Sequence, residues 1–221
     1  MDFYYDKIIN SLSDTPVLIG RDKNFRSAVF VPFIKVNNTE CVLFEKRAQG
    51  IRQAGEICFP GGMIDKNSDN SSETAAIRET VEELGISEDK IRIDKKLGYL
   101  VSNIGATIDV FIGRLEITSL KELTINTKEV ESIHAVPFRF FIETKPDVYR
   151  LETEIKPVYY DEKGNKTVLF PAMELGLPQM YHAPWSARKV NIYVYRNEEI
   201  TIWGLTASIM HELTEIPGRE D

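Results

Sequence analysis

The sequence predicts a mixed α+β fold, in which a mixed β-sheet is sandwiched between helices in an α/β/α arrangement. Strand-like apolar runs and helical segments mix along the chain without the strict strand–helix–strand alternation of an all-parallel sheet. Hydrophobic residues make up 43% of the 221 residues and charged residues 28%, a balance typical of a chain with a real core and a solvated surface. A chain of this length fits one domain. We therefore expect a single domain over residues 1–221, with a proline-rich insertion at about 145–185.

The N-terminal part of the chain predicts a short helix followed by a β-hairpin. Residues 3–12 carry apolar side chains near helical spacing. Residues 27–36 are β-branched and apolar, which predicts a strand with Pro32 at an edge or a bulge. Asn37-Asn38 is a turn signal, and residues 41–45 form the expected return strand.

A long loop and one helix follow this hairpin. Residues 46–71 are polar and contain Pro60-Gly61-Gly62, so we expect a long functional loop there. A helix is predicted from about Ser72 to Leu84, because serines at its start can cap it and Gly85 can end it.

The rest of the chain predicts further strands, a proline-rich region and a closing helix. Five prolines fall between residues 145 and 185, where the periodic signal weakens and where we expect material packed on the core rather than a separate domain. The expected elements are strands at 91–101, 108–116 and 130–136, a hairpin turn at 162–165, a hairpin of strands 190–196 and 200–203, and a helix at 205–213.

The charge balance argues against a nucleic-acid partner and permits a phosphate-rich substrate. The formal net charge is −7, from 34 acidic and 27 basic side chains. The sequence has no concentrated basic patch of the kind that binds duplexes, so we expect no nucleic-acid partner. An acidic protein can still bind a phosphate-rich substrate when metal cations bridge its carboxylates to the phosphates.

Targeting signals and cysteine usage predict a compartment. No stretch approaches the about 20 apolar residues of a membrane helix, and residues 1–7 lack the basic and apolar pattern of a secretory signal. Cys41 and Cys58 are too few for a disulfide framework. We therefore expect no membrane partner and a cytoplasmic location.

The predicted helix carries a group of carboxylates opposite an apolar stripe. At about 100° per residue, the stripe consists of Ile77, Val81 and Leu84. Glu79, Glu82 and Glu83 fall on the other side, where like charges three and four residues apart destabilise a helix. A solvated acidic face is one explanation of such a group.

A metal site is the other explanation, and two features favour it. Arg78 and Gly85 frame the carboxylates, and the glycine-rich turn Phe59-Pro60-Gly61-Gly62 lies shortly before them. Hard divalent cations such as Mg²⁺ prefer oxygen ligands, and clustered carboxylates lose their repulsion by binding them. A glycine turn lets the backbone approach the same ion or a phosphate without a side chain in the way.

The pattern Arg78-Glu79-x-x-Glu82-Glu83-x-Gly85-Ile86 after Gly62 resembles the Nudix box. The resemblance implies a Nudix fold, whose loop–helix–loop binds Mg²⁺ or Mn²⁺ and hydrolyses a nucleoside diphosphate linked to another moiety. It also implies that Glu79, Glu82 and Glu83 are metal ligands. Arg78 would then brace the helix through a salt bridge, and the Gly62 carbonyl would complete the metal shell.

The first half of the box departs from the usual pattern. The glycine and the arginine stand farther apart than usual, and the early glutamate is missing. Asp65 or Asp69 lies nearby, in a loop that is lengthened. Thr80 replaces the usual aliphatic residue.

A longer resemblance covers residues 43–62, LFEKRAQGIRQAGEICFPGG. This run is similar to the signature that precedes the Nudix box in coenzyme A pyrophosphatases, and residues 27–32 and 202–207 resemble two further parts of that branch. The resemblance implies cleavage of coenzyme A or acyl-CoA to 3′,5′-ADP and 4′-phosphopantetheine, although Ala54 stands where the branch usually has histidine. The alternatives are a pyrophosphatase for ADP-ribose, NADH or other nucleotides, and a non-catalytic nucleotide-sensing module.

Three residues are candidate substrate contacts. Arg47 and Arg52 suit phosphate, because guanidinium binds it through two parallel hydrogen bonds. The alternative for these arginines is a surface charge or a salt bridge to Glu45 or Glu56. Gly61 is the third candidate, through its backbone.

One further glutamate near the run 130–136 completes the predicted site. Glu129 and Glu131 flank its start, and strand alternation puts both on the same side. Nudix enzymes often recruit one glutamate from such a place, and Glu129 fits the branch's Glu-Val pattern better, whereas an ordinary strand-edge charge is the alternative. We expect Glu79 or Glu129 to accept the proton of the attacking water. The expected partner is a small nucleotide diphosphate substrate, and the expected assembly is a monomer or homodimer.

Overall fold

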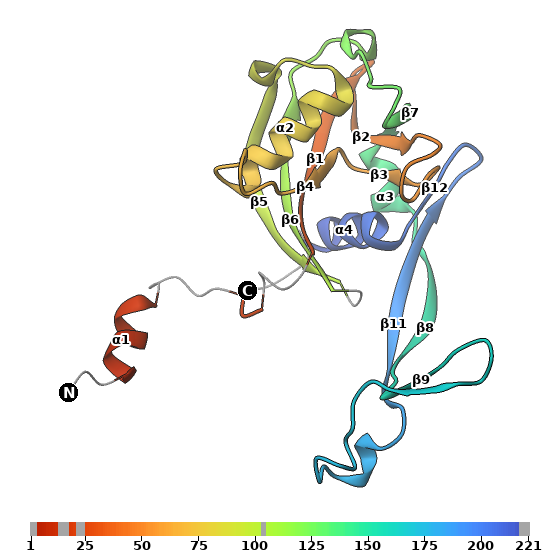
Figure 1. The fold of residues 1–221 in the computed structure, drawn as a ribbon. Helices are drawn as coiled ribbons and strands as arrows, with labels where there is room; N and C mark the ends of the chain where they lie inside the picture. The colour runs from red at the N-terminus through yellow and green to blue at the C-terminus, as the bar shows by residue number, and fades with distance from the viewer. Residues whose placement is uncertain (1–3, 13–17, 21–24, 103–104, 217–221) are drawn as a thin grey trace. The chain divides into compact units, whose positions relative to one another are not determined.

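The computed structural model describes residues 4–12, 18–20, 25–102 and 105–216 of the chain. These residues divide into two compact units, Met1–Phe138 and Arg139–Asp221, whose elements are labelled in Figure 1. The elements of the first unit are α1 (Tyr4–Ser11), β1 (Phe25–Val36), β2 (Thr39–Arg47), β3 (Ile57–Cys58), β4 (Gly61–Met63), α2 (Ser72–Leu84), β5 (Ile91–Val101), β6 (Ala106–Leu115) and β7 (Val130–Pro137).

One seven-stranded sheet forms the frame of the first unit. Its strands run in the order β3-β2-β1-β6-β5, while β4 also pairs with β1 and β7 with β2. β1 and β6 are parallel, and the other pairs of described strands in this sheet are antiparallel. The predicted mixed sheet is thus confirmed, and with it the mixed α+β class.

Strands β1 and β2 pair with each other at one end and diverge at the other. Residues 33–36 of β1 pair with β2, whereas residues 27–29 pair with β4. In the same way, residues 45–46 of β2 pair with β3. Residues 57–63, here called the wedge segment, therefore fill the space where β1 and β2 separate.

Pro32 lies inside the central strand β1, and the prediction of an edge or a bulge is wrong. β1 keeps an unbroken parallel register with β6 across this residue, with Pro32 opposite Gly113. On its other side, Pro32 falls between the residues that pair with β4 and those that pair with β2. A proline has no N–H for a ladder bond, and it is tolerated here because neither ladder on that side includes it.

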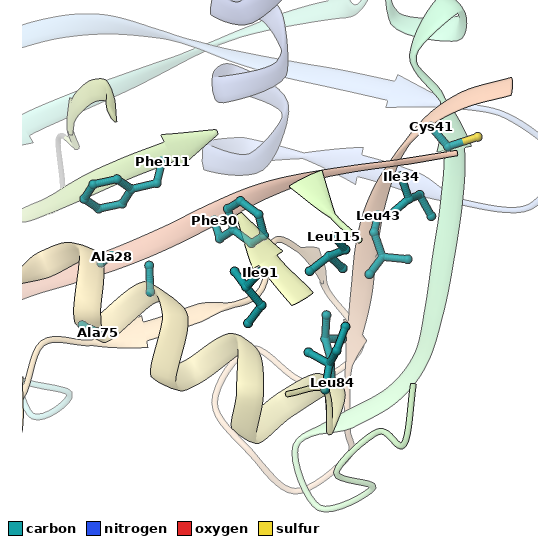
Figure 2. Close-up of a cluster of buried hydrophobic side chains, with 12 residues drawn as sticks. Ala28, Phe30, Ile34, Cys41, Leu43, Ala75, Leu84, Ile91, Phe111 and Leu115 are labelled. Carbon is teal, nitrogen blue, oxygen red and sulfur yellow. The ribbon is translucent and has the colours of Figure 1, made fainter. Parts of the chain in front are cut away.

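Helix α2 packs its apolar stripe on the sheet, as Figure 2 shows for the core around Leu84 and Phe30. Leu84 is fully buried, and Ile77 and Val81 pack against the same cluster, which confirms the predicted stripe. The buried residues of this cluster are Ala28, Phe30, Ile34, Cys41, Leu43, Ala75, Ala76, Leu84, Ile86, Ile91, Phe111 and Leu115.

Both ends of α2 follow from local sequence. The Ser71 side chain accepts a hydrogen bond from the Thr74 N–H, which satisfies a free donor in the first turn. Gly85 has φ 61° in the left-handed region and donates its N–H to the Val81 carbonyl, as a C-cap glycine does. A side chain on residue 85 would also collide with the Thr124 carbonyl. The predicted bounds of the helix are confirmed.

The second unit combines a three-stranded sheet, in the order β12-β11-β8, with a closing helix. Tyr195 is buried and packs edge-on against Phe141 at 5.1 Å between ring centroids. The residues of β8 are exposed at every position. The elements of this unit are α3 (Phe138–Glu143), β8 (Asp147–Ile155), β9 (Val158–Tyr160), β10 (Lys166–Val168), β11 (Trp185–Arg196), β12 (Thr201–Trp203) and α4 (Gly204–Glu215).

Most of the predicted elements are present. The expected helices at 3–12 and 205–213 correspond to α1 and α4, and the hairpin turn at 162–165 joins β9 to β10. Strands β3 and β4 lie inside the predicted loop 46–71, because strands of two and three residues show no periodicity. Residues 145–185 belong to the second unit, and their assignment as an insertion in a single domain stays a prediction. No helix among the described residues is long and apolar enough to cross a membrane.

Candidate active site

Helix α2 holds its three candidate carboxylates at different depths. Glu82 is the outermost, with 52% of its side chain exposed, whereas the side chain of Glu79 is 16% exposed. Glu83 is only 3% exposed, although the helical wheel places it opposite the apolar stripe. The wedge segment contacts α2 on that side, so the carboxylates are not simply a solvated face of the helix.

Gly61 fixes the side chain of Glu83. The Gly61 N–H donates to Glu83 Oε2 at 2.9 Å. Gly61 has φ 145°, and a Cβ atom there would collide with the backbone of Ala28 and Val29 in β1, so only glycine fits. The Asn126 N–H donates to the Glu83 carbonyl at 2.9 Å. Both the side chain and the backbone of Glu83 are therefore held by neighbouring segments.

Gly62 lies directly against the carboxyl group of Glu79. A Cβ atom on residue 62 would lie within 2.7 Å of three atoms of that carboxyl group. Gly62 pairs with Ala28 in the β1–β4 ladder, so the sheet sets its position. The structure thus brings both glycines of the wedge segment against carboxylates of α2.

Arg78 joins α2 to the loop that precedes it. Its Nε and Nη2 donate to the two carboxyl oxygens of Asp69, both at 3.0 Å. The same guanidinium lies 3.0 Å from Glu79 Oε1 and 3.4 Å from Glu82 Oε2. Hydrogen bonds from Arg78 hold the pKa of Asp69 below its ordinary value. A two-bond pair of arginine and carboxylate is strong and directional, so Asp69 and Arg78 set the position of the loop relative to the helix.

Glu45 is an acidic residue of the site that the sequence suggested only as a salt-bridge partner for an arginine. It is fully buried in β2 and stands opposite Cys58 in the β2–β3 ladder, whose Sγ donates to Glu45 Oε1 at 3.3 Å. Burial, and then the charge of Glu45, raise the pKa of the Cys58 thiol, so the thiol stays protonated. The sequence pattern of β2 could have revealed Glu45. Every second residue of a strand lies on the same face, and Glu45 follows Cys41 and Leu43, which belong to the core.

Burial raises the pKa of the inner carboxyl groups. The pKa of Glu83 is raised to about 9, first by burial and then by the charge of Glu45. Burial also raises the pKa of Glu45 to about 7. The pKa of Glu79 is raised by burial, against the lowering effect of Arg78. Carboxylates in this setting favour neutralisation by a proton or a cation.

Glu129 and Glu131 have different surroundings. Burial is the largest cause of the raised pKa of Glu79, and the charge of Glu129 adds to it; the Glu129 carbonyl accepts a hydrogen bond from the Ala48 N–H at 2.8 Å, just after the end of β2. Glu131 instead forms an ion pair with Lys46, with Nζ 2.5 Å from Oε1. Strand β7 begins at Val130, so Glu129 lies before the strand. The expectation that strand alternation puts Glu129 and Glu131 on the same side therefore does not apply to it.

The two candidate arginines also differ. Burial raises the pKa of Glu45 and Glu83, and the positive charge of Arg47 acts against it in both cases, so Arg47 lies beside the acidic group. The guanidinium carbon of Arg52 instead lies 5.9 Å from the centroid of the Phe25 ring. The Nε of Arg47 donates to the Arg52 carbonyl at 3.0 Å.

The donor set fits a hard divalent cation, although it is not yet arranged as a coordination shell. Within the described residues, no three His, Cys, Asp or Glu side chains form a group that could hold a metal ion. Arg78 pairs with Glu79 and Glu82 in the place where a cation would compete for them. The available donors are carboxylate and backbone oxygens, which suit Mg²⁺ and Mn²⁺. Glu45 Oε2 is buried and has no hydrogen-bond partner within the described part of the chain, so the residues fit a cation.

A surface hollow of the first unit lies away from these carboxylates. It has a volume of about 390 Å³ and is lined by residues of β1, β2 and β6, with Glu40 and Arg114 among them. None of the carboxylates described above lines it. The candidate site is therefore identified by the chemistry of its carboxylates and not by this hollow.

Comparison with known proteins identifies the family. The model of the NUDIX domain family matches residues 24–139, just over half of the chain. Nudix hydrolase 3 of Caenorhabditis elegans is 26% identical over 220 residues, which cover 94% of this chain and 82% of that protein.

Two further relatives carry more specific names. The mitochondrial coenzyme A diphosphatase NUDT8 of Mus musculus is 28% identical over 196 residues, covering 88% of this chain and 78% of that protein. The peroxisomal coenzyme A diphosphatase ndx-8 of Caenorhabditis elegans is 36% identical over 133 residues, covering 60% of this chain and 56% of that protein. With the NUDIX domain match over the region that contains the carboxylates, these relatives lead to one conclusion: the chain belongs to the Nudix family and is a Nudix pyrophosphohydrolase.

Proposed function

We propose that this chain hydrolyses the diphosphate bond of coenzyme A or acyl-CoA, with Mg²⁺ or Mn²⁺, to 3′,5′-ADP and (acyl-)4′-phosphopantetheine. The proposal rests on one observation: the end of the signature 43–62 contacts the carboxyl groups of helix α2. The two glycines that end the signature lie against Glu79 and Glu83. Similarity to the coenzyme A diphosphatases NUDT8 and ndx-8 supports this substrate class.

Glu79, Glu82, Glu83 and the Gly62 carbonyl are the proposed metal ligands. All four belong to two segments that contact each other, α2 and the wedge segment. When bound, the cation supplies charge neutralisation for the diphosphate and a more acidic water. Nudix enzymes use divalent metals generally, and Mg²⁺ or Mn²⁺ is the proposed identity here because the donors are oxygens.

The remaining residues bind the substrate, move the proton or hold the helix. Arg47, beside the acidic group, is the proposed contact for a phosphate oxygen. Arg52 and the Gly61 backbone are weaker candidates, because the side chain of Arg52 lies over Phe25 and the Gly61 N–H is already bonded to Glu83. Arg78 holds α2 against its loop through Asp69.

The proposed general base is Glu79 or Glu129. Glu79 lies against Gly62, next to the proposed ligands. The charge of Glu129 acts on Glu79, whose pKa is raised mainly by burial. A carboxylate with a raised pKa accepts a proton from water more readily near neutral pH.

The proposed setting is the cytosol, with a small nucleotide diphosphate as partner and a monomer or homodimer as the assembly. Cys41 and Cys58 are both free thiols, which suits a reducing compartment. NUDT8 and ndx-8 are named as mitochondrial and peroxisomal proteins, so the compartment is tested by fractionation of the source cell.

A panel assay tests the substrate. The purified 221-residue chain with Mg²⁺ or Mn²⁺ is incubated with coenzyme A, acyl-CoA, ADP-ribose, NADH and dinucleoside polyphosphates, and the products are separated by ion-pair chromatography. The proposal predicts that coenzyme A or acyl-CoA gives the highest kcat/KM. Preferential turnover of ADP-ribose or another nucleotide would assign a different substrate to the same enzyme.

A substitution of Glu82 separates catalysis from nucleotide sensing. Glu82 is exposed, so Glu82→Gln should leave the fold intact while hydrolysis falls by orders of magnitude, since a ligand of the cation is lost. If wild type and variant release the same small amount of product from every diphosphate, the assignment of catalysis to these carboxylates is wrong, and a nucleotide-sensing role is the alternative to test by binding.

A further inference from the structure

Glu45 is an acid at a core position of strand β2. Side chains alternate between the two faces of a strand, and Cys41 and Leu43 belong to the core that α2 covers (Figure 2). Glu45 continues this row toward the wedge segment and is fully buried. A carboxylate is seldom found in such a position unless it is paired or coordinates a metal.

Among the residues that the structure describes, Glu45 accepts one hydrogen bond that meets the geometric criteria, and it is a weak one. Cys58 donates its Sγ proton to Oε1 at 3.3 Å, and a thiol is a weak donor. Oε2 is buried and has no hydrogen-bond partner among the residues that the structure describes. One oxygen of a fully buried carboxyl group is thus open to a ligand.

The wedge segment links the Glu45 side chain to one of the proposed metal ligands. Its neighbour Cys58 stands three residues before Gly61, whose N–H binds Glu83, so the wedge segment contacts both carboxyl groups. The Cys58 Sγ lies 3.3 Å from Glu45 Oε1 and the Gly61 N lies 2.9 Å from Glu83 Oε2, so the two carboxyl groups are bound by residues three positions apart in one segment.

We propose that Glu45 is a further ligand of the divalent cation, contributed by β2 beside the carboxylates of α2. The inference rests on the proposed function, because it assumes that these carboxylates bind a cation. A bound cation would give Oε2 the partner that it lacks and would offset the repulsion between Glu45 and Glu83. The competing explanation is a neutral Glu45 that shares a hydrogen bond with Glu83 and never meets the ion.

Manganese binding to the 221-residue chain distinguishes these explanations. Titration with Mn²⁺, followed by the electron paramagnetic resonance signal of the free ion, gives affinity and stoichiometry without any substrate. Glu45→Gln should weaken binding of Mn²⁺ at least about tenfold, the loss typical of a damaged metal shell, or remove one bound ion. The matched control is Glu131→Gln, since Glu131 is paired with Lys46 on the surface, and it should bind Mn²⁺ like wild type. Equal affinity and stoichiometry in wild type and Glu45→Gln would overturn the inference.

Thermal unfolding shows whether Glu45 is a metal ligand or a residue with a purely structural role. Glutamine keeps the shape of Glu45 and removes a buried acid, so in EDTA the variant should unfold at the wild-type temperature or higher. Saturating Mn²⁺ should then raise the unfolding temperature of wild type more than that of Glu45→Gln. A lower unfolding temperature in EDTA together with unchanged Mn²⁺ binding would make Glu45 purely structural. Absence of Mn²⁺ binding to wild type would instead overturn the proposed function itself, whatever Glu45 does.

Discussion

The carboxyl group of Glu79 occupies the space that a side chain on residue 62 would need. A Cβ atom there would lie within 2.7 Å of three carboxyl atoms. Gly62 is not among the glycines with positive φ, so its backbone suits any residue. The glycine is therefore required by the contact between β4 and α2, not by a turn.

Gly62→Ala should displace Glu79 and leave the fold intact. A shift of about 1 Å in a catalytic group can reduce the rate about 100-fold, and we expect a loss of that size in kcat for the best substrate. The effect should vanish in a Glu79→Gln background, because the two changes act through one contact. Steady-state kinetics of the two single variants and the double variant measure this coupling, and fully additive losses would contradict it.

Arg78→Lys should loosen the loop that precedes α2. Lysine cannot form the two parallel bonds that Arg78 makes to Asp69, so the free energy of unfolding should fall by about 1–3 kcal/mol. Urea denaturation measures the change. Arg139→Lys is the control, because the pair of Arg139 and Glu143 on α3 is exposed and replacement of Arg139 should have almost no effect. Equal effects of the two substitutions would show that the Asp69 pair is no stronger than a surface pair.

The stability of the metal-free protein should fall as the pH rises from about 5 to 9. Burial raises the pKa of Glu83 to about 9 and that of Glu45 to about 7, from 4.5. Between the unfolded and folded pKa values the folded state binds more protons than the unfolded chain, so the free energy of unfolding decreases with pH. Each group contributes at most about 1.4 kcal/mol per pH unit.

Denaturation in EDTA at several pH values tests this dependence. Glu83→Gln removes one of the two buried acids and should flatten the slope, most clearly between pH 7 and 9, where Glu45 no longer contributes. The lowered pKa of Asp69 acts in the opposite sense, but only at lower pH, outside this window. A wild-type protein that becomes more stable from pH 5 to 9 would contradict the buried positions of Glu45 and Glu83.

Glu129→Gln should reduce kcat about 100-fold or more if Glu129 is the general base. Glu131→Gln is the matched control, because Glu131 lies two residues away and is held by Lys46; it should retain wild-type kcat. A pH–rate profile adds a second readout, since loss of the base removes the acidic limb. If Glu129→Gln keeps both rate and profile, Glu79 is the proposed base.

The elements of this fold that could be predicted from sequence are those with local signals. Residues 72–84 show a helical apolar stripe, a serine at the start and Gly85 at the end, and the helix has these bounds. The strands of β1 and β2 have long apolar runs around an asparagine turn. In each case the signal lies within about a dozen consecutive residues, where periodicity and capping operate.

The parts that could not be predicted depend on contacts between distant segments. The wedge segment becomes two short strands only because β1 and β2 separate around it. The depth of Glu83 depends on Gly61, 22 residues earlier, and no helical wheel contains that contact. Asp69 was recognisable as a nearby acid, but its pairing with Arg78 requires the folded loop.

Anomalous diffraction from crystals soaked in Mn²⁺ tests the central claim most directly. The account predicts a manganese peak in contact with carboxylate oxygens of Glu79, Glu82 and Glu83 and the Gly62 carbonyl, at the 2.0–2.6 Å typical of about six-coordinate hard cations. Arg78 should then release Glu79 and Glu82 while it keeps Asp69. A chain that hydrolyses diphosphates in Mn²⁺ but shows no manganese at α2, with Arg78 still bound to Glu79 and Glu82, would contradict it.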